Sequence, residues 1–213
     1  NLYLYLTKGE GILNFPAAEV GGFFCSDPSL ERPDLQMHFT RVSGDRDIDN
    51  NSTLDDLPGV TSIAYLTRPE SRGSVKITSS DSNEPPLIEA NYLSTENDRM
   101  TLIAGFRRLR DIFTGKSLAE VIGQELRPGA AVESDEDILA YIQQHGTTVF
   151  HPVGTCKMGN DEQAVVDGSL CVHGVSNLRV VDASIMPTLI SGNTNAATIM
   201  IAEKGADMIL GAK

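Results

Sequence analysis

The motif LRVVDASIMP occupies residues 178–187, and SGNTNAATIMIAEKGADMIL follows over residues 191–210. The β-branched run over 178–182 predicts a short buried strand that ends in the carboxylate of Asp182. The largely apolar stretch over 195–210 predicts a helix, whose start follows Asn193. A strand, a loop and then a helix present backbone N–H groups to an anion or a cofactor. The end of the sequence therefore predicts a ligand site where its last helix begins.

Upstream, the spacing of apolar residues indicates both helices and strands. The clearest helix, over 97–113, has apolar residues at intervals of three and four. Acidic residues after Ser134 predict a second helix over 135–144. Strands are predicted over 35–39, 60–66 and 74–78, whereas the glycine-rich residues 1–24 are predicted to form loops between short apolar pieces. The sequence therefore predicts an α+β fold, with a mixed or antiparallel sheet flanked by helices on one face.

Composition narrows the functional classes. With 17 Lys and Arg against 29 Asp and Glu, the net charge is −12, which argues against a nucleic-acid binder or a protein of anionic membrane surfaces. No apolar run approaches the roughly 18 residues that cross a bilayer, so no transmembrane segment is predicted. Cys25, Cys156 and Cys171 lack the spacing of a zinc site or a redox pair. We therefore predict no metal site, a reducing compartment and a cytoplasmic location.

The four histidines are not equivalent. His145 ends a predicted helix and His173 lies in a turn, so surface roles are favoured for both. His38 lies in a predicted strand, where packing and function are both open. His151 differs, because the following Pro152 keeps it out of the α region and glycines bound its stiff loop. This loop is well placed to aim an imidazole at a substrate.

Several motifs together resemble one family, the glucose–methanol–choline (GMC) oxidoreductases, which bind FAD. The C-terminal motifs that carry this resemblance are HPVGTCKMG at 151–159, LRVVDASIMP at 178–187 and SGNTNAATIMIAEKGADMI at 191–209. Upstream, PDLQMHF at 33–39, RPESRG at 68–73 and IEANYL at 88–93 resemble the family's substrate domain. The resemblance covers nearly the whole chain and is closest to the choline-dehydrogenase-like branch.

The resemblance also implies a domain organisation. The family opens with a dinucleotide-binding unit carrying G-x-G-x-x-G, and this sequence has none, so the chain resembles the C-terminal part of a longer flavoenzyme. Residues 1–18 are then a linker or lid, 19–147 the substrate-binding domain, and 148–213 the segment that carries the catalytic loop. A strand and the last helix of that segment would complete the absent FAD-binding domain. We expect this helix to expose Ala197, Met200, Ile201 and Met208, which an oligomer could bury.

Roles for individual residues come from the same resemblance. Family members oxidise an alcohol by moving a hydride to the flavin, while a base takes the hydroxyl proton. His151 matches this base, and Asn193 matches a group that donates to the substrate oxygen. His38 and Val149 match substrate-binding positions. The positions matching contacts to FAD are Asp182, Ala183, Asn193, Thr194 and Asn195.

Two alternatives to an oxidoreductase that acts on small alcohols remain open. The family includes hydroxynitrile lyases, which bind FAD without net redox chemistry. The chain could also be a folded fragment that is inactive alone and binds FAD weakly or not at all, because most contacts to FAD would lie in the missing domain. The sequence contains no Trp, so choline is not favoured over other alcohols. The electron acceptor, oxygen or a quinone, is also left open.

Overall fold

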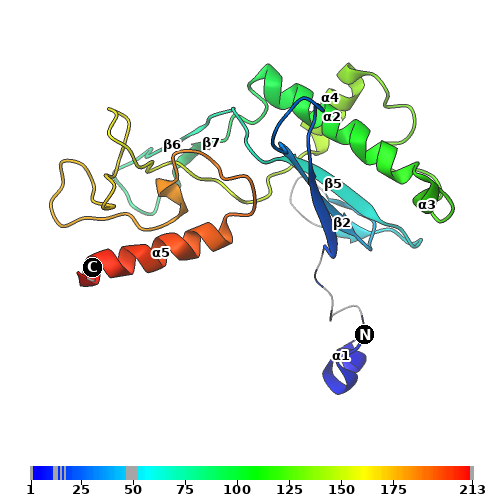
Figure 1. Ribbon diagram of the computed structural model, residues 1–213, viewed down its shortest axis with the longest axis horizontal. Helices are drawn as coiled ribbons and strands as arrows, with labels where there is room; N and C mark the ends of the chain where they lie inside the picture. The colour runs from blue at the N-terminus through cyan, green and yellow to red at the C-terminus, as the bar shows by residue number, and fades with distance from the viewer. Residues whose placement is uncertain (1, 12–13, 15, 17, 47–51, 212–213) are drawn as a thin grey trace. The chain divides into compact units, whose positions relative to one another are not determined.

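The computed structural model describes residues 2–11, 14, 16, 18–46 and 52–211, and the chain divides into two compact units (Figure 1). The first unit consists of Asn1–Leu66 and Thr101–Ile138, and the second of Thr67–Met100 and Leu139–Lys213. The predicted boundaries at residues 18 and 147 stay predictions.

The first unit is built on a three-stranded antiparallel sheet in the order β1 (Val20–Phe24), β2 (Leu35–Thr40), β5 (Thr61–Leu66). The predicted strands at β2 and β5 are confirmed. The predicted loop over Gly21 and Gly22 is wrong, because both glycines pair with β2 inside β1. A second antiparallel pair joins β3 (Gly44–Arg46) to β4 (Ser52–Leu54).

One face of this sheet is covered by helix α2 (Glu96–Phe113). The fully buried side chain of Leu35 lies against Gly105 of α2, and the ring of Phe39 lies 6.1 Å from that of Phe113. Figure 1 shows α2 running along β2 and β5. Side chains alternate along a strand, so His38 projects from the opposite face. The predicted α+β fold, with helices on one face of an antiparallel sheet, is confirmed.

The remaining helices follow their capping signals. Ser134 accepts a hydrogen bond from the N–H of Asp137 at 3.1 Å and caps α4 (Asp135–His145), as predicted. Two short helices complete this group, α1 (Leu2–Lys8) and α3 (Lys116–Ala119). Within the described ranges, no helix has both the length and the apolar character needed to cross a membrane.

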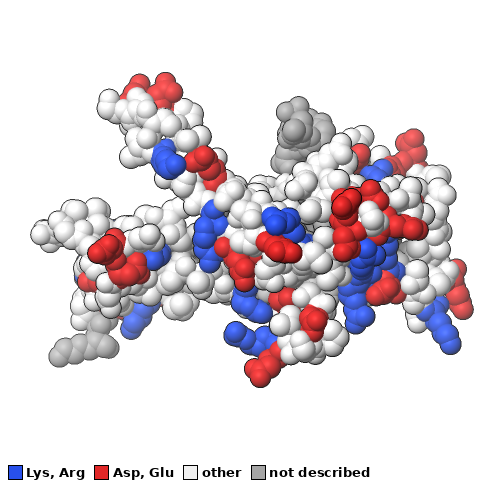
Figure 2. Space-filling view, turned by 90° about the horizontal axis from the view of Figure 1, so that it is seen from above, with Lys and Arg blue, Asp and Glu red and all other residues white. Residues whose placement is uncertain are grey.

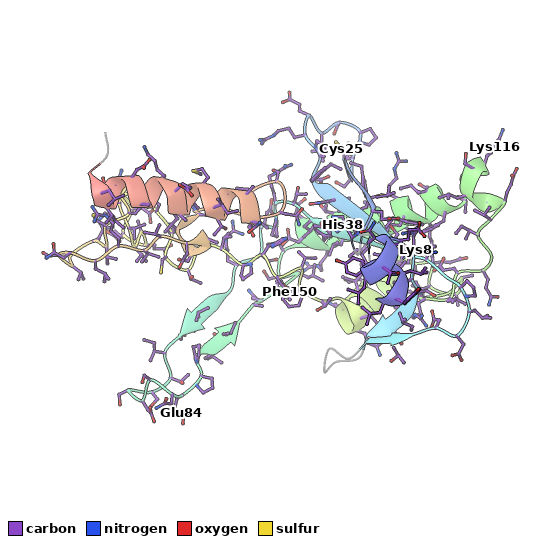
Figure 3. The ribbon with its side chains drawn as sticks, turned by 90° about the horizontal axis from the view of Figure 1, so that it is seen from below. Lys8, Cys25, His38, Glu84, Lys116 and Phe150 are labelled. Atoms are coloured by element: carbon purple, nitrogen blue, oxygen red, sulfur yellow. The ribbon has the colours of Figure 1, made fainter. Side chains whose placement is uncertain are left out.

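The second unit combines a hairpin, a loop-rich core and a long helix. The hairpin pairs β6 (Ser74–Lys76) with β7 (Leu87–Glu89), and Glu84 lies near its tip (Figure 3). The hydrophobic core of this unit packs against η2 (Ala183–Ile185) and α5 (Asn195–Leu210). Its buried members are Val166, Leu170, Ile185, Met186 and Ile201.

The strand predicted over residues 178–182 is wrong. Arg179 makes an isolated bridge to Cys171, and Asp182 is exposed at the start of η2. The backbone here bonds only a loop, through Val172 N to Leu178 O at 3.0 Å and Val180 N to Leu170 O at 3.2 Å. Within the described residues this segment has no strand partner beyond that bridge, so a β-branched run is not enough to make a strand.

The outward face of α5 also differs from the prediction. Ile201 is buried in the core of the second unit, and Ala197 and Met208 pack against that core. Met200 is exposed as predicted, at 58%, beside the exposed Ile199. The expectation that all four residues are exposed is therefore wrong for three of them, because loops of the same unit already cover them.

Helix α5 contacts the 178–182 segment closely at Gly205. A Cβ atom added there would lie 2.3 Å from Cγ1 of Val181, too close for any real contact. We expect Gly205→Ala to lower the free energy of unfolding by about 1–3 kcal/mol, even though alanine favours helices. Thermal unfolding followed by circular dichroism measures this effect. Val181→Ala should restore part of the lost stability in the double variant, and equal losses with and without it would contradict the clash.

Candidate active site

The structure brings His151 and Asn193 together in the second unit. Nδ2 of Asn193 lies 3.0 Å from Nε2 of His151, and Oγ1 of Thr194 lies 3.2 Å from Nδ1 of the same ring. Residues more than 40 positions apart in the sequence therefore engage both nitrogens of one imidazole.

These contacts select one form of the ring. An amide nitrogen can only donate a hydrogen bond, so Nε2 of His151 accepts and keeps its lone pair. Nδ1 then carries the proton and donates it to the hydroxyl of Thr194. The imidazole thus presents Nε2 as an acceptor directly beside the amide of Asn193.

The N-cap side chain of α5 contacts His151 instead of capping the helix. Thr194 is the N-cap residue of α5, yet its side chain makes no capping hydrogen bond, because Oγ1 turns to His151. Its carbonyl accepts from Thr198 Oγ1 at 2.8 Å, and the residue is buried. Thr194 therefore contacts the imidazole rather than capping the helix with its side chain.

The loop after His151 is tied to the segment before α5. Cys156 N donates to Ser184 O at 3.0 Å, and Met158 N donates to Ile185 O at 2.8 Å. Gly154 has a φ of +89°, and a Cβ there would lie only 3.3 Å from Met186 O. The close approach of these two segments therefore depends on a glycine.

The residue before His151 is strained. Phe150 has a φ of 60°, in the left-handed region, and 64% of it is exposed (Figure 3). This conformation costs a non-glycine residue about 1–2 kcal/mol. Its N–H donates to Thr148 Oγ1 at 3.0 Å, which helps to fix the bend. Backbone strain of this kind clusters at functional sites. Sequence reasoning missed Phe150, since nothing in the residue type signals a positive φ.

The other predicted cofactor contacts lie on the same segments. The carboxylate of Asp182 is exposed and caps η2 by accepting from Ser184 N at 2.8 Å, and Ala183 begins that helix. Asn195 is exposed as the first residue of α5, and Val149 is half-buried two positions before His151. Their roles in binding cofactor or substrate stay predictions.

His38 belongs to the first unit and lies half-buried on the sheet face opposite α2 (Figure 3). Its Nε2 lies 3.2 Å from both Gln36 Nε2 and Tyr65 Oη, and its ring meets that of Tyr65 edge-on at 5.4 Å. These contacts fit a histidine packed on a sheet face. The substrate-binding role of His38 stays a prediction.

A buried carboxylate organises the loop around RPESRG. The carboxylate of Asp98, 2% exposed, accepts from the backbone N–H groups of Glu70 and Ser71 at 2.8 Å each and from Ser71 Oγ. Burial alone would raise the pKa of Asp98, but the hydrogen bonds from Ser71 and Glu70 outweigh it and hold the pKa below the ordinary value. Thr95 Oγ1 accepts from Asp98 N at 3.2 Å, which is half of a capping box.

Charge around these elements is mixed. On the face shown in Figure 2, Lys and Arg side chains are interspersed with Asp and Glu. In the part of the chain that the structure describes, no group of three or more His, Cys, Asp or Glu residues is arranged to hold a metal ion.

Comparison with known proteins identifies the family to which this chain belongs. A family model described as GMC oxidoreductase matches residues 69–202, which include His151 and Asn193. The chain belongs to the GMC oxidoreductase family. It is 44% identical over 209 residues to an oxygen-dependent choline dehydrogenase of Proteus mirabilis and also 44% identical over 209 residues to an alcohol dehydrogenase (acceptor) of Pseudomonas putida. Both alignments cover 98% of this GMC chain, which spans only 37% of the length of each relative.

Solved structures agree with this family. Pyridoxine 4-oxidase from Mesorbium loti matches 92% of the GMC chain with a TM-score of 0.81 and 30% sequence identity, and the match covers 38% of that protein. Formate oxidase from Aspergillus oryzae matches 99% of the chain with a TM-score of 0.84, covering 41% of its own length. At 24% identity, this second likeness shows the fold alone.

The Asp98 carboxylate gives a test of the loop. We expect Asp98→Asn to lower the free energy of unfolding by about 2 kcal/mol near neutral pH, because an amide places N–H groups against donors. The folded pKa of Asp98 is lowered, so its stabilisation is present above the unfolded pKa of about 4 and is lost as the pH falls through the folded pKa. Urea titrations should therefore show the gap between the two proteins closing in acid.

Asp111→Asn is the matched control, since Asp111 is exposed on the same helix. It should change stability little at either pH. A gap for Asp98→Asn that stays constant into acid would contradict the role of the ionised carboxylate.

Proposed function

We propose that this chain supplies the substrate-binding and catalytic portion of an FAD-dependent alcohol oxidoreductase. The observation that carries the proposal is the 3.0 Å pairing of the Asn193 amide with Nε2 of His151. A hydroxyl group needs one donor for its oxygen and one acceptor for its hydrogen, and this pair offers both. The names of the choline and alcohol dehydrogenase relatives support the same reaction class.

An alcohol would enter between the two groups. Its oxygen takes the hydrogen bond of Asn193 Nδ2, and its hydroxyl hydrogen turns to the lone pair of His151 Nε2. The alcohol thus replaces a hydrogen bond within the protein by two of its own.

Oxidation then removes a proton and a hydride from the alcohol. The O–H proton passes to His151 Nε2 as the C–H bond of the carbinol carbon breaks, and a C=O bond forms. Nδ1–H keeps its hydrogen bond to Thr194 and holds the ring in place as it becomes charged. Asn193 donates to the oxygen while negative charge develops on it. When bound, FAD supplies the two-electron acceptor for the hydride.

The start of α5 fits such a cofactor. The side chain of its N-cap residue Thr194 makes no capping hydrogen bond, and the positive end of the helix dipole there would suit an electron-rich group such as a flavin. Asn193 and Asn195, both exposed at this point, and Thr194 would approach the ring. Asp182 and Ala183 would approach the ribityl–phosphate region.

The proposed substrate is a small alcohol. The substrate-binding roles of His38 and of Val149 are separate predictions from the family resemblance. The proposed partner is a dinucleotide-binding domain with G-x-G-x-x-G, which the longer relatives leave room for. An oligomer contact through the exposed Ile199 and Met200 of α5 is part of the same proposal. The cytoplasmic location stays a prediction.

His151→Ala should slow alcohol turnover by roughly 10²–10⁴-fold in the flavin-loaded enzyme, because the proton loses its acceptor. Asn193→Ala should cost less, about 1–3 kcal/mol of transition-state stabilisation, since one hydrogen-bond donor to the alcohol oxygen is lost. Steady-state kinetics with choline and simple primary alcohols measures both. His145→Ala, at the exposed end of α4, is the matched control. Unchanged turnover in His151→Ala would remove His151 from the mechanism.

Reduction of the flavin separates an oxidoreductase from a lyase. We expect an alcohol substrate mixed anaerobically with the flavin-loaded enzyme to bleach the absorbance of oxidised flavin in a single turnover. The reason is that hydride transfer reduces the cofactor, whereas lyase chemistry has no net electron transfer. Stopped-flow absorbance records the change. Turnover of a cyanohydrin with the flavin spectrum unchanged would favour the hydroxynitrile-lyase alternative.

A further inference from the structure

A hydrogen bond links the RPESRG loop to the turn before α5. Nη1 of Arg68 lies 2.8 Å from Oγ of Ser191, although 123 positions separate the two residues. Ser191 is exposed and stands two residues before Asn193. The turn between them is tight, with Gly192 N donating to Ile190 O at 2.8 Å. The guanidinium therefore holds the turn from which the Asn193 amide projects.

The segment that carries Arg68 is itself firmly anchored. The buried carboxylate of Asp98 binds the N–H groups of Glu70 and Ser71, two and three residues after Arg68. Oγ of Ser71 in turn accepts from Ser94 N at 3.0 Å. Arg68 thus reaches Ser191 from a backbone that is fixed from two sides.

The turn gains most from such a restraint. Exposed residues around a glycine have many backbone conformations to lose on ordering. The Asn193 amide lies 3.0 Å from Nε2 of His151, and it must stay close enough for one alcohol oxygen to reach both groups, while Thr194 lies 3.2 Å from Nδ1.

We propose that Arg68 is a positioning residue for the His151–Asn193 pair and acts through Ser191. This inference rests on the function proposed above, because its effect on rate needs that pair to be catalytic. Arg68 touches neither reacting group in this scheme. Arg68 holds the turn through Ser191, and the turn holds the side-chain amide of Asn193 in position. That amide then donates a hydrogen bond to the alcohol oxygen.

The test compares Arg68→Gln and Ser191→Ala in the flavin-loaded enzyme. Each should lower kcat about tenfold, the loss expected for one hydrogen bond to a charged donor. KM, flavin content and melting temperature should stay close to those of the wild type, because the amide is misplaced while the fold is kept. Ser191→Thr keeps a hydroxyl and should restore most of the rate.

Double variants show whether the effect passes through the turn. Arg68→Gln combined with Ser191→Ala should be no slower than either single variant. Arg68→Gln should also add nothing to Asn193→Ala, because the group that it positions is already gone. Additive losses in either pair would overturn the proposal in favour of a general structural role.

Arg72→Gln is the matched control, since its guanidinium bonds the carbonyls of Pro69 and Ser71 in the same loop. It should keep nearly the wild-type kcat, and a tenfold loss there would also overturn the proposal. If the wild type oxidises alcohols and His151→Ala does not, full activity in Arg68→Gln refutes the inference alone. If the wild-type chain, assembled with its dinucleotide-binding domain and loaded with flavin, oxidises no alcohol, the proposed function itself fails.

Discussion

The imidazole of His151, held at both nitrogens by consecutive residues, is the constraint on which the site depends. Asn193 and Thr194 can meet the ring together only if the turn before α5 is fixed and α5 begins at Asn195. Oγ1 of Thr194 faces Nδ1 of His151 and makes no capping hydrogen bond to α5. A lost cap costs about 1 kcal/mol, so the second unit gives up helix stability to fix the tautomer of one histidine.

The hydrophobic core of the second unit provides stability to α5 in place of the missing N-cap hydrogen bond. Ile201 buries α5 against Ile185 and Met186, and Gly205 lets the helix approach Val181. The backbone around Ser184 and Ile185 then holds the loop that follows His151. The packing that stabilises α5 therefore also sets the distance between His151 and the start of α5, where Asn193 and Thr194 lie.

Patterns within one segment could be predicted from the sequence, and contacts between segments could not. Helical spacing gave α2 and α5 almost to the residue, because an amphipathic stripe is a local property. The strand at 178–182 failed because a strand also needs a neighbour, and β1 was missed because paired glycines are typical of loops. The resemblance named His151 and Asn193, but the Thr194 contact and the reach of Asp98 to Ser71 depend on tertiary structure.

Two locally unfavourable features lie beside His151 in the second unit. Phe150 takes a left-handed conformation that glycine or asparagine adopts more easily, and Thr194 leaves a helix start uncapped. A chain shaped only for stability would have no reason to keep both features beside the same histidine. Phe150 directly precedes His151 in the chain and bends the backbone there, whereas Thr194 contacts the imidazole itself. Leu93 and Leu170 of the same unit also take positive φ, so strain alone does not mark the site, but beside His151 it coincides with the two hydrogen bonds that fix the ring orientation.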